Sequence, residues 1–258
     1  MEIKSLEATP ALKIGCAGWS LRLEQQSLFA EGDSQLQRYA SVFEAVEVNS
    51  CFYRPHRKST WLRWAESTPE NFRFSYKLPK TITHQARLQG VDELLEGFLD
   101  QVDNLESRLG TLLVQLPPSF AFDSRVVCEF FALLRRLDDR RQVQRAVACE
   151  PRHASWFTPE ASGLLEDLEV AGVAAHPAQL GQDVVPFGFK GHVYYRLHGA
   201  PRVYYSAYSD EQLEKLAVTL SQSIEAGIET WCIFDNTAEG HAVSNALQLM
   251  ELMRREVA

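Results

Sequence analysis

The chain has 258 residues, of which 45% are hydrophobic and 23% are charged. This composition supplies a large core and excludes a disordered chain. The formal net charge of −8 opposes long-range attraction to DNA and to anionic membranes, although it permits a locally basic pocket. No apolar run approaches the length that a membrane-spanning helix needs, so we expect no membrane contact.

Eight short apolar runs are rich in β-branched or aromatic residues, and each ends at a Pro, Gly, Asn or charged residue. Runs of this length and composition are typical of buried β-strands. In chain order the predicted strands are Leu12–Trp19, Ala45–Tyr53, Phe72–Pro79, Thr111–Pro118, Ala146–Arg152, Val173–Gln179, His192–Gly199 and Trp231–Asn236.

Helical patterns separate most of these strands. Asp123 and Thr158 are suitable N-caps, and Ser209 with Gln212 has the spacing of a capping box. Gly172 is a candidate stop for the helix that begins at Thr158. The link between the sixth and seventh strands is too short for a full helix, so a loop is expected there.

This alternation predicts an α/β fold, a parallel eight-stranded (β/α)8 TIM-like barrel, in which residues 1–258 form a single domain. An open doubly wound sheet is the alternative. It is disfavoured because no GxGxxG motif follows any predicted strand.

The five cysteines include no CxxC pair. Four lie in runs that are typical of strands, and Cys128 lies in a helical pattern. We expect reduced core residues of a cytoplasmic protein. The first ten residues lack the apolar core of a signal peptide, which agrees with that location.

The carboxyl ends of the predicted strands carry many polar and charged side chains. In a barrel of this kind these ends meet at one mouth, where active sites lie. Alternate residues of a strand share a face, so several of the side chains point the same way. They are Glu47 and Asn49 after the second strand, Lys77 and His84 after the third, Gln115 after the fourth, Glu150, Arg152 and His153 after the fifth, His176 after the sixth, Arg196 and His198 after the seventh, and Asp235 and Asn236 after the eighth.

Two interpretations of these charges are open. Buried charges are costly without partners, so Glu150 and Arg152 could belong to an ion-pair network that closes the barrel mouth, with Glu47, Lys77 and Arg196 as partners. They could equally form a site for a charged ligand. The spread over most strands favours the ligand site.

The remaining basic residues indicate the sign of the ligand. Arg54, Arg57 and Lys58 follow the second strand, and others follow the third, on a protein that is acidic as a whole. A basic face predicts an anionic ligand. Gly240 and His241 begin the last helix, where free backbone N–H groups bind anions, although an ordinary glycine-containing loop explains that segment equally well.

Seven sequence blocks together cover nearly the whole chain: GCAGWS, VEVNSCFYR, FRFSYKLPKTITH, LLVQLPPSF, EPRHASWF, YYRLHG with YSDEQL, and FDNTAEGHAVSNAL. In this order they resemble the blocks of the YecE-like family of a domain of unknown function, number seventy-two in its series. The resemblance implies a TIM barrel and no particular activity. The candidate site residues that the resemblance implies at this mouth are Glu47, Asn49, Lys77, His84, Glu150, Arg152, His153, Arg196 and His198.

Two blocks depart from the pattern that the resemblance implies. An Asp is usual after the sixth strand, where this chain has His176. Phe-Asn-Asn is usual after the eighth, where this chain has Phe234, Asp235 and Asn236. One acid is lost and one is added, so charge is redistributed around the same mouth.

The leading functional hypothesis is an enzyme that acts on an anionic, phosphorylated small molecule as a hydrolase, isomerase or lyase. Glu47 or Glu150 would be the general base, and His153 or His198 would move protons. Trp19, Tyr53 and Trp156 would form the pocket wall. The residues expected to bind the substrate or its anionic group are Asn49, Lys77, His84, Arg152, Arg196, Asn236, Gly240 and His241.

A second hypothesis is a metal-dependent phosphoesterase, resembling an endonuclease, that acts on nucleic acid. Its metal ligands would be Glu47, Glu150, His198 and Asp235. Neighbouring cations compete with a metal, no HxH, HxxxH or HExxH spacing occurs, and the net charge disfavours nucleic acid, so we expect no cofactor. A third hypothesis is a barrel that binds a metabolite or serves as a scaffold without catalysis. The oligomeric state stays open.

Overall fold

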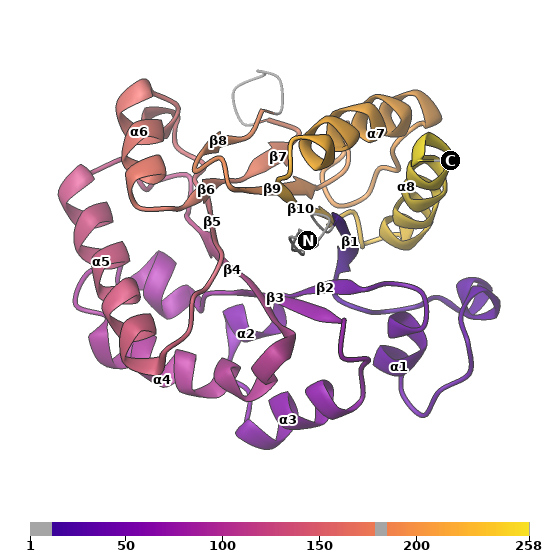
Figure 1. The fold of residues 1–258 in the computed structure, drawn as a ribbon, viewed down its shortest axis with the longest axis horizontal. Coiled ribbons are helices and arrows are strands. Elements are labelled where there is room, and N and C mark those ends of the chain that lie inside the picture. Colours follow the sequence, from indigo (N-terminus) through magenta and orange to yellow (C-terminus); the bar gives the residue numbers. More distant parts are fainter. Residues whose placement is uncertain (1–11, 179–184, 258) are drawn as a thin grey trace, which may run out of the picture.

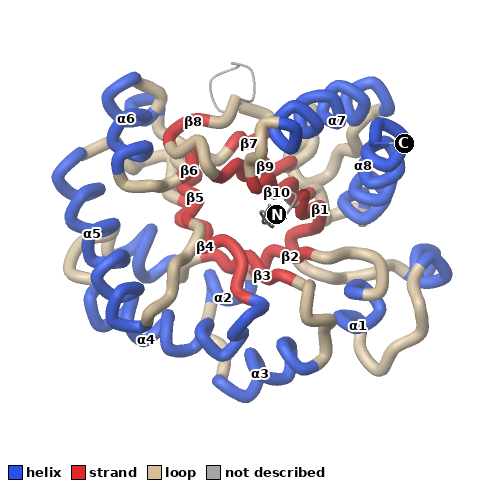
Figure 2. Tube along the Cα trace, viewed as in Figure 1, coloured by secondary structure: helices blue, strands red, loops and turns tan. Residues whose placement is uncertain are grey.

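The computed structural model describes residues 12–178 and 185–257, and its strands form a nearly closed ring surrounded by helices (Figures 1 and 2). The sheet order is β7-β9-β10-β1-β2-β3-β4-β5-β6-β8. The strands are β1 (Leu12–Ala17), β2 (Ala45–Val48), β3 (Arg73–Lys77), β4 (Leu109–Gln115), β5 (Val147–Glu150), β6 (Ala171–Gly172), β7 (Ala174–His176), β8 (Phe187–Gly188), β9 (His192–Leu197) and β10 (Glu229–Phe234).

The predicted α/β barrel is confirmed, with one strand built differently. All pairs around the ring are parallel, and β1 closes it by pairing with both β10 and β2. The sixth strand is divided at Val173 into β6, which pairs with β5, and β7, which pairs with β9. The two-residue strand β8 adds an antiparallel edge to β6. Between β6 and β7 the ring of strands is continued by the covalent chain at Val173.

The outer layer consists of helices between the strands (Figure 1). Apolar residues at helical spacing turn one face of each long helix to the barrel. The helices are η1 (Leu23–Leu28), α1 (Gln35–Ala40), α2 (Ser50–Tyr53), α3 (Lys58–Glu66), the π turn η2 (Thr81–Gln85), α4 (Asp92–Val102), η3 (Asp103–Arg108), α5 (Ser124–Arg141), η4 (Ala154–Trp156), α6 (Pro159–Asp167), α7 (Asp210–Glu225) and α8 (His241–Val257).

The predicted helix caps are present. The Asp123 side chain accepts hydrogen bonds at the start of α5, and the Thr158 side chain does so at the start of α6. Ser209 and Gln212 form the expected capping box of α7. Gly172 does not stop α6, because that helix already ends at Asp167 and Gly172 lies in β6.

One predicted strand, Ala45–Tyr53, differs from the structure in its second half. The strand ends at Val48, since Asn49 has a helical backbone (φ −95°, ψ −16°) and caps the short helix α2. Cys51 therefore lies in a helix, where its thiol donates to the Val48 and Lys77 carbonyls. Part of the link between the sixth and seventh predicted strands, residues 179–184, lies outside the described residues. The described remainder of that link holds β8 and no helix.

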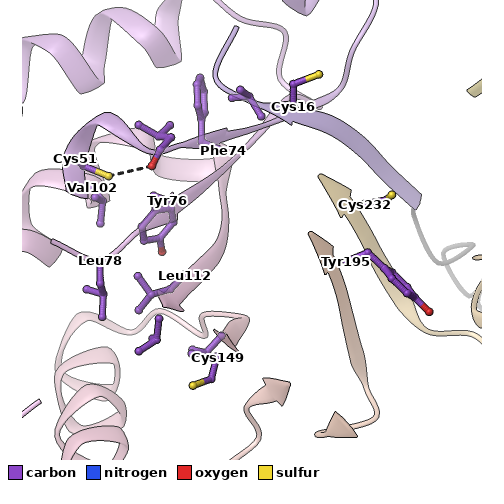
Figure 3. Packing of buried hydrophobic residues seen from close by; sticks show 14 of the residues in the cluster. Cys16, Cys51, Phe74, Tyr76, Leu78, Val102, Leu112, Cys149, Tyr195 and Cys232 are labelled. Atoms are coloured by element: carbon purple, nitrogen blue, oxygen red, sulfur yellow. Dashed lines mark hydrogen bonds between the residues drawn. The ribbon is translucent and has the colours of Figure 1, made fainter. Parts of the chain in front are cut away.

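The main core lies between the barrel and its helices. Figure 3 shows Phe74, Tyr76 and Leu112 packed in this layer together with three of the cysteines, Cys16, Cys51 and Cys149. All five cysteines are free thiols, as expected. A second cluster fills the barrel interior and consists of Ala45, Leu113, Ala148, Ala171, Val173, Tyr194, Trp231 and Ile233. In the described part of the chain, no helix combines the length and apolarity needed to cross a membrane.

Candidate functional site

Strand parity places the candidate site directly above the interior cluster. Ala45, Ala148 and Tyr194 point into the barrel, and the side chains two residues later point the same way. Those next positions are Glu47 on β2, Glu150 on β5 and Arg196 on β9. All three side chains are at most 1% exposed, so their charges depend on one another for partners.

Arg196 is the centre of an ion-pair cluster at this mouth. Its Nε and Nη2 donate to the two carboxylate oxygens of Glu47 at 2.9 and 2.6 Å. Its Nη1 donates to Glu150 Oε2 at 2.6 Å, and Nη2 also donates to Asp235 Oδ2 at 2.9 Å. The guanidinium thus joins three strands that are distant in sequence, β2, β5 and β9, to the end of β10.

The floor of the cluster is polar as well. The Tyr194 hydroxyl lies 2.9 Å from Glu47 Oε2 and 2.7 Å from Ser75 Oγ. Burial, followed by the charge of Glu47, raises the pKa of the Tyr194 phenol well above its ordinary value. Tyr194 therefore remains a neutral donor that fixes the Glu47 carboxylate.

The pairing decides the protonation states of the acids. Burial alone would raise the pKa of Glu150, but Arg196, His198 and Arg152 outweigh it and hold that pKa well below its ordinary value. Burial would likewise raise the pKa of Asp235, yet Arg196 and His198 lower it. Both carboxylates are therefore ionised at neutral pH.

His198 links two of these acids. Its Nδ1 lies 3.0 Å from Asp235 Oδ2, and its Nε2 lies 3.5 Å from Glu150 Oε1. Burial lowers the pKa of His198, but the two carboxylates outweigh burial and raise it above the ordinary value. The protonated form of this imidazole is therefore favoured by its two acidic neighbours.

A cationic rim, defined here as Lys77, His84 and Arg152, lies at the same mouth. Arg152 donates through Nε and Nη2 to Glu150 Oε1 at 3.0 and 2.9 Å. The Nζ of Lys77 lies 4.1 Å from the Phe52 ring centroid, and the His84 ring packs edge-on against the same ring. Burial lowers the pKa of His84, and the charges of Lys77 and Arg152 lower it further, so His84 is a neutral donor beside two cations.

Several predicted ligand-binding residues do not join the cluster. Asn236 is buried and donates to Ser206 O and to Asn245 Oδ1, so it holds a loop to α8. His153 Nδ1 lies 2.9 Å from Ser155 Oγ in its own loop.

At the start of α8, the Gly240 N–H donates to Thr237 O, and the His241 ring lies 3.6 Å from Glu239. Asn49 lies at the end of β2, and its buried Oδ1 has no hydrogen-bond partner among the described residues.

The three aromatic residues expected in the pocket wall have different environments. Trp156 is fully buried, packs against Phe122 and donates to Phe120 O, so it belongs to the core. Trp19 packs on Trp64 and lines a cavity of about 410 Å³ between α1 and α3. Tyr53 is 71% exposed.

Sequence reasoning missed three participants. Tyr194 and Ser75 lie one inward position below the charged layer, and parity within β9 and β3 would have identified them. Tyr204 packs edge-on against the His198 ring and has a φ of +70°, a strained value for a residue with a side chain. No sequence signal marks its position.

The hypothetical metal ligands surround a guanidinium. Glu47, Glu150 and Asp235 all direct an oxygen to Arg196, and His198 lies between two of these acids. Within residues 12–178 and 185–257, no group of three or more His, Cys, Asp or Glu side chains is arranged to hold a metal ion. In this arrangement the carboxylate oxygens of the three acids are engaged by the Arg196 guanidinium.

The chain is similar to curated proteins, to solved structures and to one family model. The chain is 40% identical to UPF0759 protein YecE of Escherichia coli strain K12 over 89 residues, which cover 34% of this chain and 33% of that protein. The chain thus matches about a third of the length of that relative. UPF0759 protein YunF of Bacillus subtilis strain 168 is 24% identical over 93% of this chain and 94% of its own.

Solved structures show the same fold. A DUF72 family protein from Thermotoga maritima has a TM-score of 0.74 and 26% identity, over 94% of this chain and 99% of that chain. A DUF72 family protein from Enterococcus faecalis has a TM-score of 0.75 and 24% identity, over 95% and 96%. The family model described as "Protein of unknown function DUF72" matches residues 13–258. Because the match extends over almost the entire barrel, the chain belongs to the DUF72 family, as its sequence blocks indicated.

Proposed function

We propose that this protein is an enzyme that acts on a small anionic, phosphorylated molecule at the barrel mouth by general acid–base chemistry. The observation that carries the proposal is the balance of charge there. The three carboxylates of the cluster are already engaged by Arg196, and two of them also by Arg152 or His198. In the described part of the chain, Lys77 and His84 of the cationic rim make no ion pair with a carboxylate, although Glu150, Glu47 and Asp235 act on Lys77 from a greater distance.

An anion among the rim residues would remove an electrostatic penalty. Burial and then the charge of Arg196 lower the pKa of Lys77, and burial followed by the charges of Lys77 and Arg152 lowers the pKa of His84. A phosphoryl group offers negative charge and several acceptor oxygens to such donors. The acidic surface elsewhere would confine anion binding to this mouth.

His198 is the residue best suited to transfer a proton. Asp235 fixes its Nδ1, which leaves Nε2 as the exchanging nitrogen. Glu150 is a weak base because its pKa is held so low, and Glu47 is fully engaged by Arg196. We therefore assign Glu47 and Glu150 to positioning Arg196 and His198, and proton transfer to His198.

The anion site is tested by calorimetric titration with inorganic phosphate and with sugar phosphates, each beside its unphosphorylated counterpart. We expect the phosphorylated compounds to bind, and Arg152→Ala to weaken that binding at least tenfold, which corresponds to about 1.4 kcal/mol. Arg125→Ala is the matched control, because Arg125 is an exposed arginine that pairs with Glu129 on α5. Equal binding of phosphorylated and neutral compounds would contradict the proposal.

Catalysis is separated from binding by His198→Asn. An enzyme should keep its affinity for the phosphorylated ligand in this variant and lose turnover of that ligand by 10²-fold or more, the usual contribution of a general acid or base. If neither the unsubstituted protein nor His198→Asn converts the ligand that it binds, the protein is instead a metabolite-binding barrel.

A further inference from the structure

Lys77 is a partly buried amine at the end of β3. Ser75 points into the barrel and contacts Tyr194, so strand parity sends the Lys77 side chain into the mouth one position higher. Ser75 is level with Glu47 in the β2–β3 register. Lys77 therefore stands above the Arg196 cluster, inside the ring of strands.

The surroundings of Lys77 disfavour its charged form. Its Nζ packs on the face of Phe52 and makes no ion pair with any carboxylate of the described residues. Burial and then the charge of Arg196 lower its pKa from 10.5 to about 8, against the weaker opposing effect of Glu150, Glu47 and Asp235. Lys13, by contrast, pairs with Glu44 at 3.0 Å on the outside of the barrel.

We propose that Lys77 is a nucleophile that forms a Schiff base with the carbonyl group of an anionic aldehyde or ketone. A lysine that is desolvated and adjacent to another cation is the form of this side chain that attacks carbonyl carbons. This inference rests on the proposed function and specifies its substrate class: a small carbonyl compound that carries a phosphate, whose charge Arg152 and His84 would bind.

The covalent step balances without a cofactor. The Nζ lone pair forms a bond to the carbonyl carbon, the π electrons move to the oxygen, and one proton passes from nitrogen to that oxygen. A second proton, taken from solvent, then joins the hydroxyl group, the C–O bond breaks, and water leaves as the nitrogen lone pair completes the C=N bond. The protonated imine keeps a positive charge, which the carboxylates of Glu47, Glu150 and Asp235 stabilise from below.

The test is reductive trapping in the full-length protein. The protein is incubated with dihydroxyacetone phosphate or glyceraldehyde 3-phosphate, and in parallel with dihydroxyacetone or glyceraldehyde, in the presence of sodium cyanoborohydride. Peptide mapping by mass spectrometry then locates the reduced adduct. We expect modification of Lys77 by a phosphorylated probe to exceed that of any other lysine at least tenfold, and to exceed its modification by the neutral probe.

Variants of Lys77 provide a second test of the adduct site. Lys77→Arg and Lys77→Met should remove the adduct, whereas Lys13→Arg should keep it. Because the mapping is done on the unsubstituted protein, it remains decisive even where a Lys77 variant does not fold. Adducts distributed over the exposed lysines with none at Lys77 would overturn the inference.

Failure of the inference is distinguishable from failure of the proposed function. Thermal denaturation is measured with the same phosphorylated probes without reductant, since a ligand that binds the native state raises the melting temperature. Stabilisation without an adduct at Lys77 would leave the anion site standing and refute the nucleophile. Absence of both, together with no stabilisation by inorganic phosphate, would refute the anion site as well.

Discussion

At the scale of single residues, Arg196 decides whether the mouth is stable. Removal of one member of a buried ion-pair cluster leaves its partners charged and unpaired, which costs about 3–5 kcal/mol. We expect Arg196→Met to lower the free energy of unfolding by about this amount at neutral pH, measured by urea denaturation. Arg125→Met on the exposed face of α5 should change it by less than about 0.5 kcal/mol.

The loss in Arg196→Met should also depend on pH. In the native cluster the folded-state pKa of Glu150 is depressed, so its stabilising contribution is present above the unfolded value of 4.5 and is lost as pH falls. Without Arg196, burial raises the folded-state pKa of Glu150, so the buried carboxylate destabilises the variant at neutral pH. This penalty decreases as pH falls toward 4.5, because the carboxyl group becomes protonated. The difference between variant and native protein should shrink from pH 7 to pH 5. A difference independent of pH would show that the carboxylates are not the cause.

The residues that occupy the mouth were predictable, and one interpretation paired Glu150 with Arg196, but the central position of Arg196 among three acids was not predictable. Glu47, Glu150 and Arg196 follow from strand ends and parity alone. Their contact across the barrel depends on the stagger of β2, β5 and β9, which no local pattern records. Gly240, Asn236 and Trp156 were expected at the ligand, and the structure instead shows them in turn, loop and core contacts, because loop conformation is set by tertiary packing.

At the scale of elements, Arg145 ties a helix, a turn and a strand together. It donates to Asp138 of α5 and to Asp103 of η3 at 2.6 Å each, and lies 3.3 Å from the Tyr76 hydroxyl of β3. Arg145 is 4% exposed although the surrounding sequence is strongly charged. Mixed charges at the end of a helix resemble a solvated surface, so a local pattern does not disclose this buried cluster.

The Arg145 cluster gives an element-scale prediction. We expect Arg145→Ala to lower the free energy of unfolding by about 3 kcal/mol, because Asp138 would be left buried without its main partner. Arg140→Ala is the matched control, since Arg140 lies on α5, the helix of Asp138, is 63% exposed and pairs with Glu96 at 3.3 Å. Its effect should stay under about 1 kcal/mol. Equal effects in chemical denaturation would mean that the cluster contributes no more than a surface pair.

The boundary between β2 and α2 shows that tertiary contacts override a local preference for β-strand. The run from Ala45 to Tyr53 is rich in strand-forming residues, yet its second half forms α2. The Cys51 thiol and the ring of Phe52 then bridge to Lys77 of β3, which a continued strand would not allow. Tertiary contacts outweigh a preference of less than about 1 kcal/mol per residue.

At the scale of the whole molecule, the ring closes through close backbone contact between its first two strands. Gly15 of β1 is level with Ala45 of β2. A Cβ on Gly15 would overlap the Ala45 carbonyl oxygen and press on the Tyr39 hydroxyl, which itself bridges the Cys16 N–H and that carbonyl. Only glycine therefore fits this contact, and barrel closure depends on it.

Two glycine substitutions test this view of closure. Gly15→Ala should destabilise the protein by about 1–3 kcal/mol, because the added methyl group forces neighbouring backbone apart where no flexible side chain can yield. Gly97→Ala on α4 adds the same methyl group in open space, and should stabilise the protein by about 0.5–1 kcal/mol through helix propensity. If Gly15→Ala destabilises the protein and Gly97→Ala stabilises it, in thermal and in urea denaturation alike, the first effect arises from the β1–β2 contact and not from the loss of a glycine. If both variants were stabilised, the β1–β2 contact would have to tolerate a wider spacing, and the barrel would be less tightly closed than its register implies.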